Sequence, residues 1–167
     1  KIFPEMLKAS REIAARQDME VAVAVAPTLE ERYFRALYPL EGVHLIRGAT
    51  YEVMAHADFA LVTSGTATLE TALFETPMVV VYRTSWFTYL LGRLLIQVEN
   101  IGLVNIVAGK TIVPECIQGK ATAANLVREA LRLLNDDAAL EAARRELSLV
   151  RQKLGESGAS QRVADHI

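Results

Sequence analysis

Cysteine is almost absent from this sequence, because the 167 residues contain only Cys116. One cysteine excludes an internal disulfide and is typical of a protein from a reducing compartment. No Cys-x-x-Cys pair lies near it, and His44, His56 and His166 are scattered along the chain, so the sequence predicts no metal site. We interpret Cys116 as a small buried hydrophobic residue.

The sequence also lacks a surplus of charge and lacks long apolar runs. Eighteen Lys and Arg residues against 20 Asp and Glu give a formal net charge of −2, whereas nucleic-acid-binding domains are typically basic. No apolar run approaches the roughly 20 residues of a membrane-spanning helix. The charged, amphipathic start "KIFPEMLKASREIAAR" is unlike a signal peptide. We expect a soluble protein, at most bound to a membrane surface, that does not bind nucleic acid.

Short apolar runs alternate with helical patterns along the chain. The runs predict strands at 19–27, 43–46, 59–63 and 78–82, and the spacing of apolar residues predicts helices at 1–16, 28–39, 49–57, 66–75 and 85–97. This alternation is typical of a parallel sheet covered on both faces, the Rossmann-like doubly wound α/β class. The length and the 51% hydrophobic content favour a single domain over residues 1–167.

The second half of the chain is predicted to be mostly helical. Residues 98–120 have no clear period and are predicted to form a loop, and helices are predicted at 122–135, 137–155 and 159–167. We expect residues 120–167 to form a helical tail packed on the domain. Near the start, Thr28 and Glu31 have the spacing of a capping box for the helix predicted at 28–39.

The predicted order of elements begins with a helix, although α/β units of this kind normally begin with a strand. In a Rossmann-like order the first strand lies in the middle of the sheet, where its absence would leave a gap with unpaired backbone groups. Three explanations stay open. Lys1 is a cut point inside a longer protein, a second copy lends a strand or helix by swapping, or the sheet closes without this strand.

A small, hydroxyl-rich turn follows the strand predicted at 59–63. Ligands of open α/β sheets bind outside the carboxyl ends of the strands. Gly65 has no Cβ, so a ligand can approach its backbone, and the free N–H groups of a helix start favour an anion. The hydroxyls of Ser64, Thr66 and Thr68 add donors for phosphate oxygens. The turn is therefore a candidate phosphate site, with an ordinary N-cap as the alternative.

Glu70 lies about one helical turn beyond this candidate site. It follows Ser64 by six residues and Thr66 by four, whereas a capping box needs a spacing of three. At four residues it shares a helix side with Thr66 and faces the turn. A carboxylate there would accept two hydrogen bonds from a ribose diol. The alternative is a solvated surface glutamate.

The helix predicted at 85–97 is apolar almost all round, with Trp86, Phe87 and Tyr89 near its start. A helix of this kind is usually buried. Its aromatic residues also suit a homodimer contact or an acyl-chain or membrane-surface contact. These three interpretations stay open.

Two long segments of the sequence resemble a known family. "ADFALVTSGTATLETALFETPMVVVYRTSWFTYLLGRLL" and "NIGLVNIVAGKTIVPECIQGKATA" are similar to the C-terminal half of the lipid-A-disaccharide synthases, inverting glycosyltransferases of the GT-B fold from Gram-negative bacteria. "VAPTLEERYF" and "SQRVADHI" extend the resemblance over nearly the whole chain. The combination of "SGTATLE", "P-VVVYR" and "N-I-AGK-IVPE-IQ" is specific, whereas related UDP-sugar enzymes share the Ser-Gly…Glu element.

The resemblance implies a reaction and a place for it. The family transfers the diacylglucosaminyl group of UDP-2,3-diacylglucosamine to 2,3-diacylglucosamine 1-phosphate and releases UDP, in lipid A biosynthesis. It implies a cytoplasmic protein, peripheral on the inner face of the bacterial inner membrane, without a cofactor or a divalent metal. Because GT-B enzymes hold the nucleotide in the C-terminal domain, the chain resembles the donor half. The expected catalytic base and a Gly-Ser-Arg turn belong to parts outside it, so we expect this chain alone to be inactive.

The resemblance also assigns roles to residues. Glu70 would hold the ribose hydroxyls, the turn residues Ser64, Gly65, Thr66 and Thr68 would lie at the diphosphate, and Asn105, Glu115 and Gln118 would line the nucleotide and sugar side. The alternative for Glu115 is a solvated charge on a loop. Arg83 is a local cation for the diphosphate or a member of a structural ion pair.

Two other functions stay open. One is a different GT-B enzyme of UDP-N-acetylglucosamine, an epimerase or an undecaprenyl-linked transferase. The other is a non-catalytic module whose main role is dimerisation. An NAD-binding domain is disfavoured, because no Gly-x-Gly-x-x-Gly follows a strand.

Overall fold

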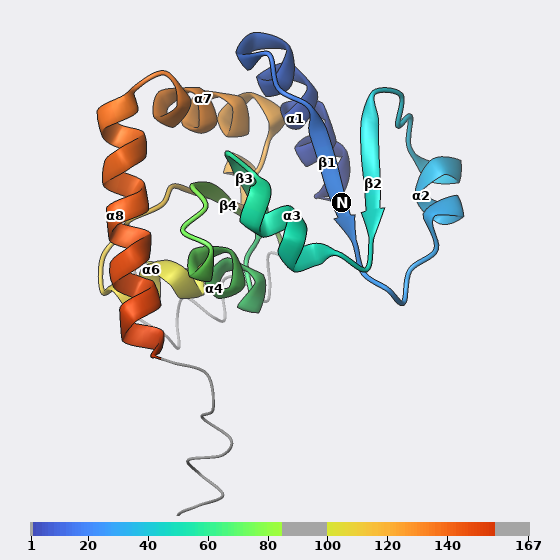
Figure 1. The fold of residues 1–167 in the computed structure, drawn as a ribbon. Helices are drawn as coiled ribbons and strands as arrows, with labels where there is room; N and C mark the ends of the chain where they lie inside the picture. Colours follow the sequence, from blue (N-terminus) through green and yellow to red (C-terminus); the bar gives the residue numbers. More distant parts are fainter. Residues whose placement is uncertain (1, 85–99, 156–167) are drawn as a thin grey trace, which may run out of the picture.

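The computed structural model describes residues 2–84 and 100–155. Strands alternate with helices along the chain (Figure 1). The strands are Val21–Val25 (β1), Val43–Arg47 (β2), Ala60–Thr63 (β3), Met78–Tyr82 (β4) and Glu115–Ile117 (β5). The helices are Phe3–Gln17 (α1), Glu31–Leu37 (α2), Thr50–His56 (α3), Thr66–Leu73 (α4), Leu103–Ala108 (α6), Ala123–Leu134 (α7) and Asp137–Leu154 (α8), with a 3₁₀ turn at Gln118–Lys120 (η1). The helices predicted at 85–97 and 159–167 lie outside the described residues.

All strand pairs are parallel, which confirms the predicted α/β class, but the strands form two sheets. β1 pairs with β2, and β3, β4 and β5 form a second sheet in that order. β1 and β3 do not pair with each other. The alternative that one sheet closes without a further strand is therefore wrong for the part of the chain that is described.

Helices cover both faces of the strands (Figure 1). α1 and α7 pack together on one side, where α1 contacts β1 and α7 contacts β4. α3 and α4 contact each other on the opposite side, against β1, β2 and β3. α8 runs along α4 and α6, so α7 and α8 of the predicted tail both pack on the domain.

β4 is the centre of the larger sheet and is buried on both faces. Val79 and Val81 are fully buried against α1 and α7, in a cluster that includes Leu126. Met78 and Val80 point to the opposite face, in a cluster that includes Leu147 of α8. Burial on both faces explains why this strand reads as a continuous apolar run.

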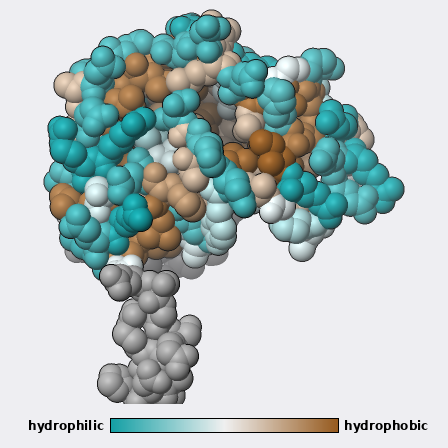
Figure 2. All heavy atoms as spheres, viewed as in Figure 1, coloured by the Kyte–Doolittle hydropathy of each residue, from teal (hydrophilic) through white to brown (hydrophobic). Residues whose placement is uncertain are grey.

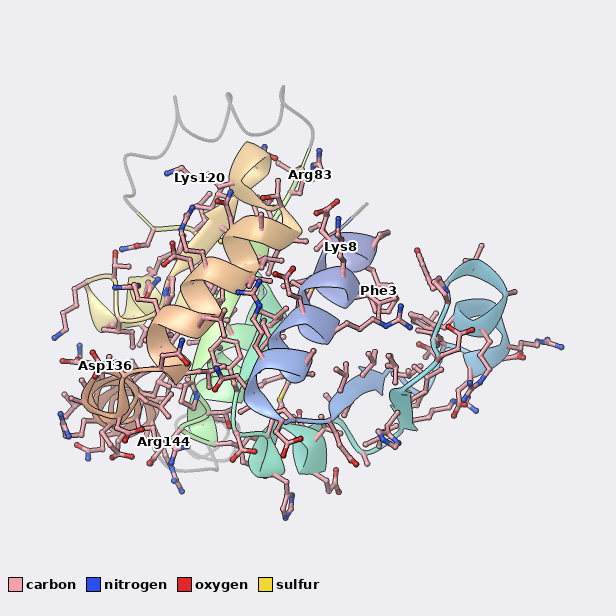
Figure 3. All side chains as sticks on the ribbon, turned by 90° about the horizontal axis from the view of Figure 1, so that it is seen from above. Phe3, Lys8, Arg83, Lys120, Asp136 and Arg144 are labelled. Atoms are coloured by element: carbon pink, nitrogen blue, oxygen red, sulfur yellow. The ribbon has the colours of Figure 1, made fainter. Side chains whose placement is uncertain are left out.

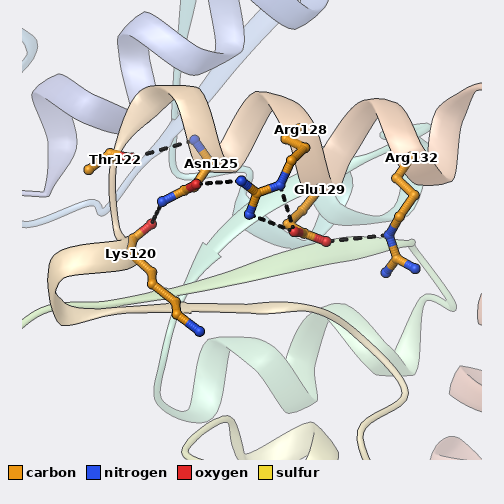
Figure 4. A network of polar contacts seen from close by, with 6 residues as sticks. All are labelled: Lys120, Thr122, Asn125, Arg128, Glu129 and Arg132. Atoms are coloured by element: carbon orange, nitrogen blue, oxygen red, sulfur yellow. Dashed lines mark hydrogen bonds and ion pairs between the residues drawn. The ribbon is translucent and has the colours of Figure 1, made fainter.

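Polar contacts fix the start of α7. The Ala123 N–H donates to a carboxylate oxygen of Glu5 in α1, at 2.7 Å. The hydroxyl of Thr122 accepts from the Asn125 N–H at 3.4 Å, as an N-cap. Along the exposed side of α7, Asn125 contacts Arg128, which pairs with Glu129 (Figure 4). Exposed pairs of this kind contribute little to stability, whereas the part-buried Glu5 contact links α1 to the start of α7.

Three boundary predictions are wrong. The helix predicted at 28–39 begins at Glu31, after an N-cap at Glu30 that makes no side-chain capping bond. Thr28 therefore forms no capping box, because residues 26–29 make a turn closed by the Leu29 N–H on the Ala26 carbonyl at 2.9 Å. The loop predicted at 98–120 contains α6 and β5. These elements are too short, at six and three residues, to show a clear period.

The surface is mixed, and apolar areas lie between hydrophilic ones on the visible face (Figure 2). Large apolar side chains are exposed at scattered positions, including Leu37, Tyr51 and Leu149, as on ordinary protein surfaces. Within residues 2–84 and 100–155, no helix combines the length and apolar character needed to cross a membrane. The same residues hold no cluster of potential metal ligands.

Cys116 is a core residue in β5, as predicted, with 2% of its surface exposed. Burial raises the pKa of its thiol above the ordinary value, and the nearby Glu129 adds to this effect.

We expect a thiol reagent at pH 8 to label the folded chain at least about tenfold more slowly than the urea-unfolded chain. Because the folded pKa is raised, this thiol leaves stability unchanged at neutral pH and lowers it as the pH rises from the unfolded pKa through the folded pKa, where the unfolded chain ionises first. Equal labelling rates would contradict a buried, inert thiol.

Candidate functional site

The candidate site lies where three neighbouring parallel strands end. Ser64 and Gly65 follow β3, Arg83 follows β4 and Gln118 follows β5. The registers place Thr63 beside Val81 and Tyr82 beside Ile117, so these three ends lie at one edge of the sheet. Arg83 and Lys120 lie at the same end of the molecule (Figure 3). In an open α/β sheet this edge is where ligands bind.

The turn after β3 is held in place from two sides. The Ser64 N–H donates to the Val81 carbonyl at 2.9 Å, and the Ser64 hydroxyl donates to the Ile101 carbonyl at 3.2 Å. Gly65 has a φ of 143°, and apart from its chain neighbours no atom of residues 2–84 and 100–155 lies within 4 Å of the place where its Cβ would lie. The turn therefore requires glycine for its backbone conformation and leaves the space over that residue open.

α4 begins at this turn, with Gly65 as its N-cap. No side chain of the described residues makes a capping bond, so neither Ser64 nor Thr66 caps the helix. The Thr68 hydroxyl is fully buried and donates to the Gly65 carbonyl at 2.8 Å, which fixes the turn from below. Thr66 is exposed. The helix start thus presents N–H groups and the Thr66 hydroxyl, a combination that favours an anion.

Glu70 lies on α4 four residues after Thr66 and is half-buried. Among the described residues no side chain or backbone group forms a hydrogen bond or ion pair with its carboxylate. The buried side of α4 consists of Thr68, Thr71 and Ala72, whereas Leu73 is 39% exposed. The carboxylate is therefore not used to hold α4 on the domain.

Asn105 and Glu115, both predicted to line the site, form an internal network. The fully buried Asn105 amide donates to the Val113 carbonyl at 2.9 Å and to Glu115 at 2.8 Å. Its oxygen accepts from the N–H groups of Ile112 at 2.8 Å and Val113 at 3.1 Å. Ligand contact by Asn105 stays a prediction, and the structure gives this residue a different role, because its donors and acceptors are already occupied.

The Glu115 carboxylate completes this network at the start of α6. It accepts from the N–H groups of Ile101 at 2.9 Å and Gly102 at 3.0 Å, which satisfies donors of the helix start. Glu115 is half-buried and is therefore not a solvated loop charge. The network joins β5 to α6 and fixes the segment that holds the Ser64 hydroxyl.

Gly102, at the start of α6, leaves little space for a side chain. A Cβ at this position would lie 3.1 Å from a Glu115 oxygen and 3.3 Å from both methyl groups of Val80. We expect Gly102→Ala to lower the free energy of unfolding by about 1–3 kcal/mol through overpacking, measured by urea denaturation. Gly119→Ala is the matched control, because nothing lies within 4 Å of its Cβ position. Equal effects of the two changes would contradict the tight packing at Gly102.

Among the predicted site residues, Gln118 has a buried side-chain N–H donor without a partner in the described part of the chain. Its side chain is 94% buried and its backbone has a left-handed φ of 52°. The Oε1 atom accepts from the Thr84 N–H at 3.1 Å, whereas the Nε2 atom has no partner among residues 2–84 and 100–155. A buried donor without an acceptor is unfavourable, so this amide is suited to an acceptor supplied from outside the described protein atoms.

Cations at this edge come from Arg83 and Lys120, both exposed. Arg83 makes no ion pair within the described part of the chain, so its two predicted roles stay open. Lys120 was missed by the sequence-based prediction. Its position in the sequence could have indicated a site residue, because Lys120 lies two residues after Gln118, in the turn that follows a strand.

The fold and this edge define a parallel α/β domain with an anion-favouring turn at the carboxyl ends of its strands, the class that includes nucleotide-binding domains. The family model described as lipid-A-disaccharide synthetase matches residues 4–164. The chain therefore belongs to the lipid-A-disaccharide synthetase family, which is a family of glycosyltransferases.

Relatives named lipid-A-disaccharide synthase match along almost the whole chain. The protein from Syntrophus aciditrophicus is 47% identical over 168 residues, which cover 98% of this chain and 44% of the relative. The protein from Anaeromyxobacter dehalogenans strain 2CP-1 is 46% identical over 172 residues, which cover 100% of this chain and 45% of the relative. The protein from Geobacter sulfurreducens is 39% identical over 98% of this chain and 44% of the relative. The chain thus spans less than half the length of these relatives.

Proposed function

We propose that this chain is the part of a lipid-A-disaccharide synthase that binds the nucleotide of UDP-2,3-diacylglucosamine. The observation that carries the proposal is the open turn at Gly65, whose free N–H groups begin the same helix that presents the half-buried Glu70. A phosphate binds such a helix start, and a carboxylate one turn further binds a diol. The family membership supplies the reaction in which this donor is used.

The diphosphate lies over Gly65 in this proposal. N–H groups of the turn and the hydroxyls of Ser64 and Thr66 donate to its oxygens, and Thr68 supports the turn from inside. Arg83 and Lys120, at the ends of the neighbouring strands, offset the negative charge that grows on UDP as it leaves. No metal ion is needed for this step, because the helix start and the cations supply the positive potential.

The ribose and the base or sugar contact the remaining residues. Glu70 accepts hydrogen bonds from the ribose hydroxyls. The Nε2 of Gln118 donates to an acceptor of the nucleotide or sugar, which would satisfy a buried donor that has no partner among residues 2–84 and 100–155. Asn105 and Glu115 do not contact the nucleotide in this proposal. They hold the segment that contains Ile101, whose carbonyl accepts from the Ser64 hydroxyl.

The transfer itself needs a group that this proposal places outside residues 1–167. A hydroxyl of 2,3-diacylglucosamine 1-phosphate attacks the anomeric carbon, the bond from that carbon to the diphosphate breaks, and the configuration inverts. A base must accept the proton of the attacking hydroxyl, and we assign no residue of this chain to that role. The chain alone is therefore proposed to bind donor without turning it over, in a complete enzyme that is cytoplasmic and peripheral on the inner membrane.

NMR chemical-shift mapping tests where the nucleotide binds. Titration of the ¹⁵N-labelled chain with UDP is expected to shift the backbone amides of Gly65 and Thr66 and the side-chain amide of Gln118. The side-chain amide of Asn135, at the C-cap of α7, is the internal control and should not move. Shifts confined to α7 and α8, or no shifts at millimolar UDP, would contradict the proposed site.

A further inference from the structure

The side-chain amide of Gln118 joins the ends of two neighbouring strands, β5 and β4. Its Oε1 atom accepts from the backbone N–H of Thr84 at 3.1 Å. Thr84 directly follows Arg83, so this bond fixes the main chain beside an exposed guanidinium at the end of β4. The Nε2 atom of the same amide has no partner among residues 2–84 and 100–155. One end of the amide is thus anchored, and the other end has a donor to spare in the described part of the chain.

The backbone holds Gln118 in a conformation that glutamine rarely adopts. Its φ of 52° lies in the left-handed region, and only 6% of the residue is exposed. Non-glycine residues with such a φ are uncommon, and strained residues cluster at ligand-binding and catalytic sites. A buried donor without an acceptor is a second unfavourable feature at the same residue. Both features are explained if a ligand supplies the acceptor.

The sheet places this amide within reach of a ligand at the Gly65 turn. Neighbouring strands are about 4.8 Å apart, and β4 lies between β3 and β5. The Gln118 side chain extends from the end of β5 to Thr84, so the amide is about one strand spacing from the turn after β3. Space for an approach lies beside Gly119, where apart from its chain neighbours no described atom is within 4 Å of the Cβ position.

Cations flank the amide on both sides. Arg83 precedes Thr84, and Lys120 follows Gln118 by two residues. Both cations are exposed and lie at the same end of the molecule (Figure 3). Within residues 2–84 and 100–155 neither side chain forms an ion pair. An N–H donor between two such cations is suited to an anionic oxygen, because a charged acceptor gives the stronger hydrogen bond.

We infer that Gln118 is a positioning residue for the diphosphate and that it acts through Arg83. Its Nε2 donates to an oxygen of the β-phosphate, the phosphate further from the ribose. Its Oε1 holds the Thr84 N–H and thereby the backbone that carries Arg83. One planar amide thus connects the ligand to the cation that offsets the charge of the departing UDP. The inference rests on the proposed function for the identity of the ligand, whereas the bond to Thr84 is testable without a nucleotide.

Hydrogen exchange of the Thr84 amide, followed by NMR, tests this bond in the free chain. Gln118→Met removes both the acceptor and the donor, whereas Gln118→Glu keeps an oxygen for the Thr84 N–H. We expect exchange at least about tenfold faster in Gln118→Met than in the unaltered chain, and an unchanged rate in Gln118→Glu. Equal rates in Gln118→Met and the unaltered chain would overturn the inference.

Two controls accompany this experiment. Gln17→Met is the matched change on α1, where the exposed amide donates to Asn135 at 2.8 Å, and it should leave the Thr84 amide unaffected. The Val80 N–H, which donates to the Pro114 carbonyl at 2.9 Å, reports in each variant whether the sheet is intact. Where Gln118→Met loses the sheet, the bond is judged on the unaltered chain, whose Thr84 amide should exchange slowly.

Nucleotide titration tests the link to Arg83. UDP should shift the Thr84 amide proton downfield in the unaltered chain, because an amide that donates to an anion becomes a stronger acceptor. Arg83→Gln should weaken UDP binding by about fivefold in the unaltered chain, but by less than about twofold in Gln118→Met. For UMP, which lacks the β-phosphate, each change should alter the affinity by less than about twofold.

The possible failures are distinguishable. Equal effects of Arg83→Gln on UDP binding in the two backgrounds would show that the residues act independently, and this would overturn the inference while leaving the proposed function intact. Equal losses for UMP and UDP would remove the β-phosphate as the ligand of Gln118. If the unaltered chain binds no UDP, the proposed function fails, and the assignment of a phosphate to Gln118 fails with it.

Discussion

Replacing Asn105 with leucine is expected to lower the free energy of unfolding by about 3 kcal/mol, because several buried hydrogen bonds are lost together. The change removes the amide donor to the Val113 carbonyl and the Glu115 carboxylate, and it leaves the N–H groups of Ile112 and Val113 without their acceptor. Leucine has the same branched arrangement of side-chain heavy atoms as asparagine and leaves no cavity, so the lost hydrogen bonds dominate the effect. Urea denaturation followed by circular dichroism measures the change.

Asn125→Leu is the matched control for this experiment. Asn125 carries the same side chain, but its side-chain bonds to Lys120 and Arg128 are exposed on α7. Its replacement should change the free energy of unfolding by no more than about 0.5 kcal/mol. If Asn105→Leu costs no more than Asn125→Leu, the internal network does not hold α6 on β5 and Asn105 is free for another role.

Replacing Glu70 with glutamine is expected to weaken UDP binding by about tenfold or more and to leave the free energy of unfolding unchanged. A carboxylate accepts two hydrogen bonds from a diol, whereas the amide of glutamine offers one acceptor oxygen and no charge. Folding is unaffected because Glu70 forms no hydrogen bond with the described residues. Calorimetric titration measures affinity, and urea denaturation measures stability.

Two comparisons separate a ribose contact from a general charge effect. Glu75→Gln is the same change just beyond the end of α4, where the side chain pairs with Arg151 at 3.2 Å, and it should leave UDP affinity unchanged. In the unaltered chain 2′-deoxy-UDP should bind more weakly than UDP. That preference should shrink in Glu70→Gln, because the residue that recognises the hydroxyl has been changed. A full preference for UDP in Glu70→Gln would remove Glu70 from the ribose site.

The longer elements were predictable because their signals are local. β4 reads as a continuous apolar run, because both of its faces are buried by helices. α7 and α8 carry apolar residues at helical spacing and begin at the capping residues Thr122 and Asp136. α6 and β5 were missed, because each owes its conformation to contacts with the rest of the domain. The bonds of Asn105 and Glu115 are such contacts.

The site was predictable in part for the same reason. The Ser64–Gly65 turn is visible in the sequence, because strand, turn and helix follow one another there. The supporting role of Asn105 was not visible, since it depends on Val113 and Glu115, eight and ten residues further on. β1 was predicted to be a buried strand, but Ala22 and Ala24 are exposed, and local sequence does not tell whether a strand has neighbours on both edges.

Calorimetric titration of the chain with UDP, with AMP as the control nucleotide, shows whether this chain holds the donor nucleotide. We expect saturable binding of UDP with a one-to-one stoichiometry, and weaker binding of AMP. AMP carries the same ribose diol with a different base and a single phosphate, so the comparison separates a UDP site from a general anion site. Equal binding of the two nucleotides, or binding of neither, would contradict the claim that this chain holds the donor nucleotide.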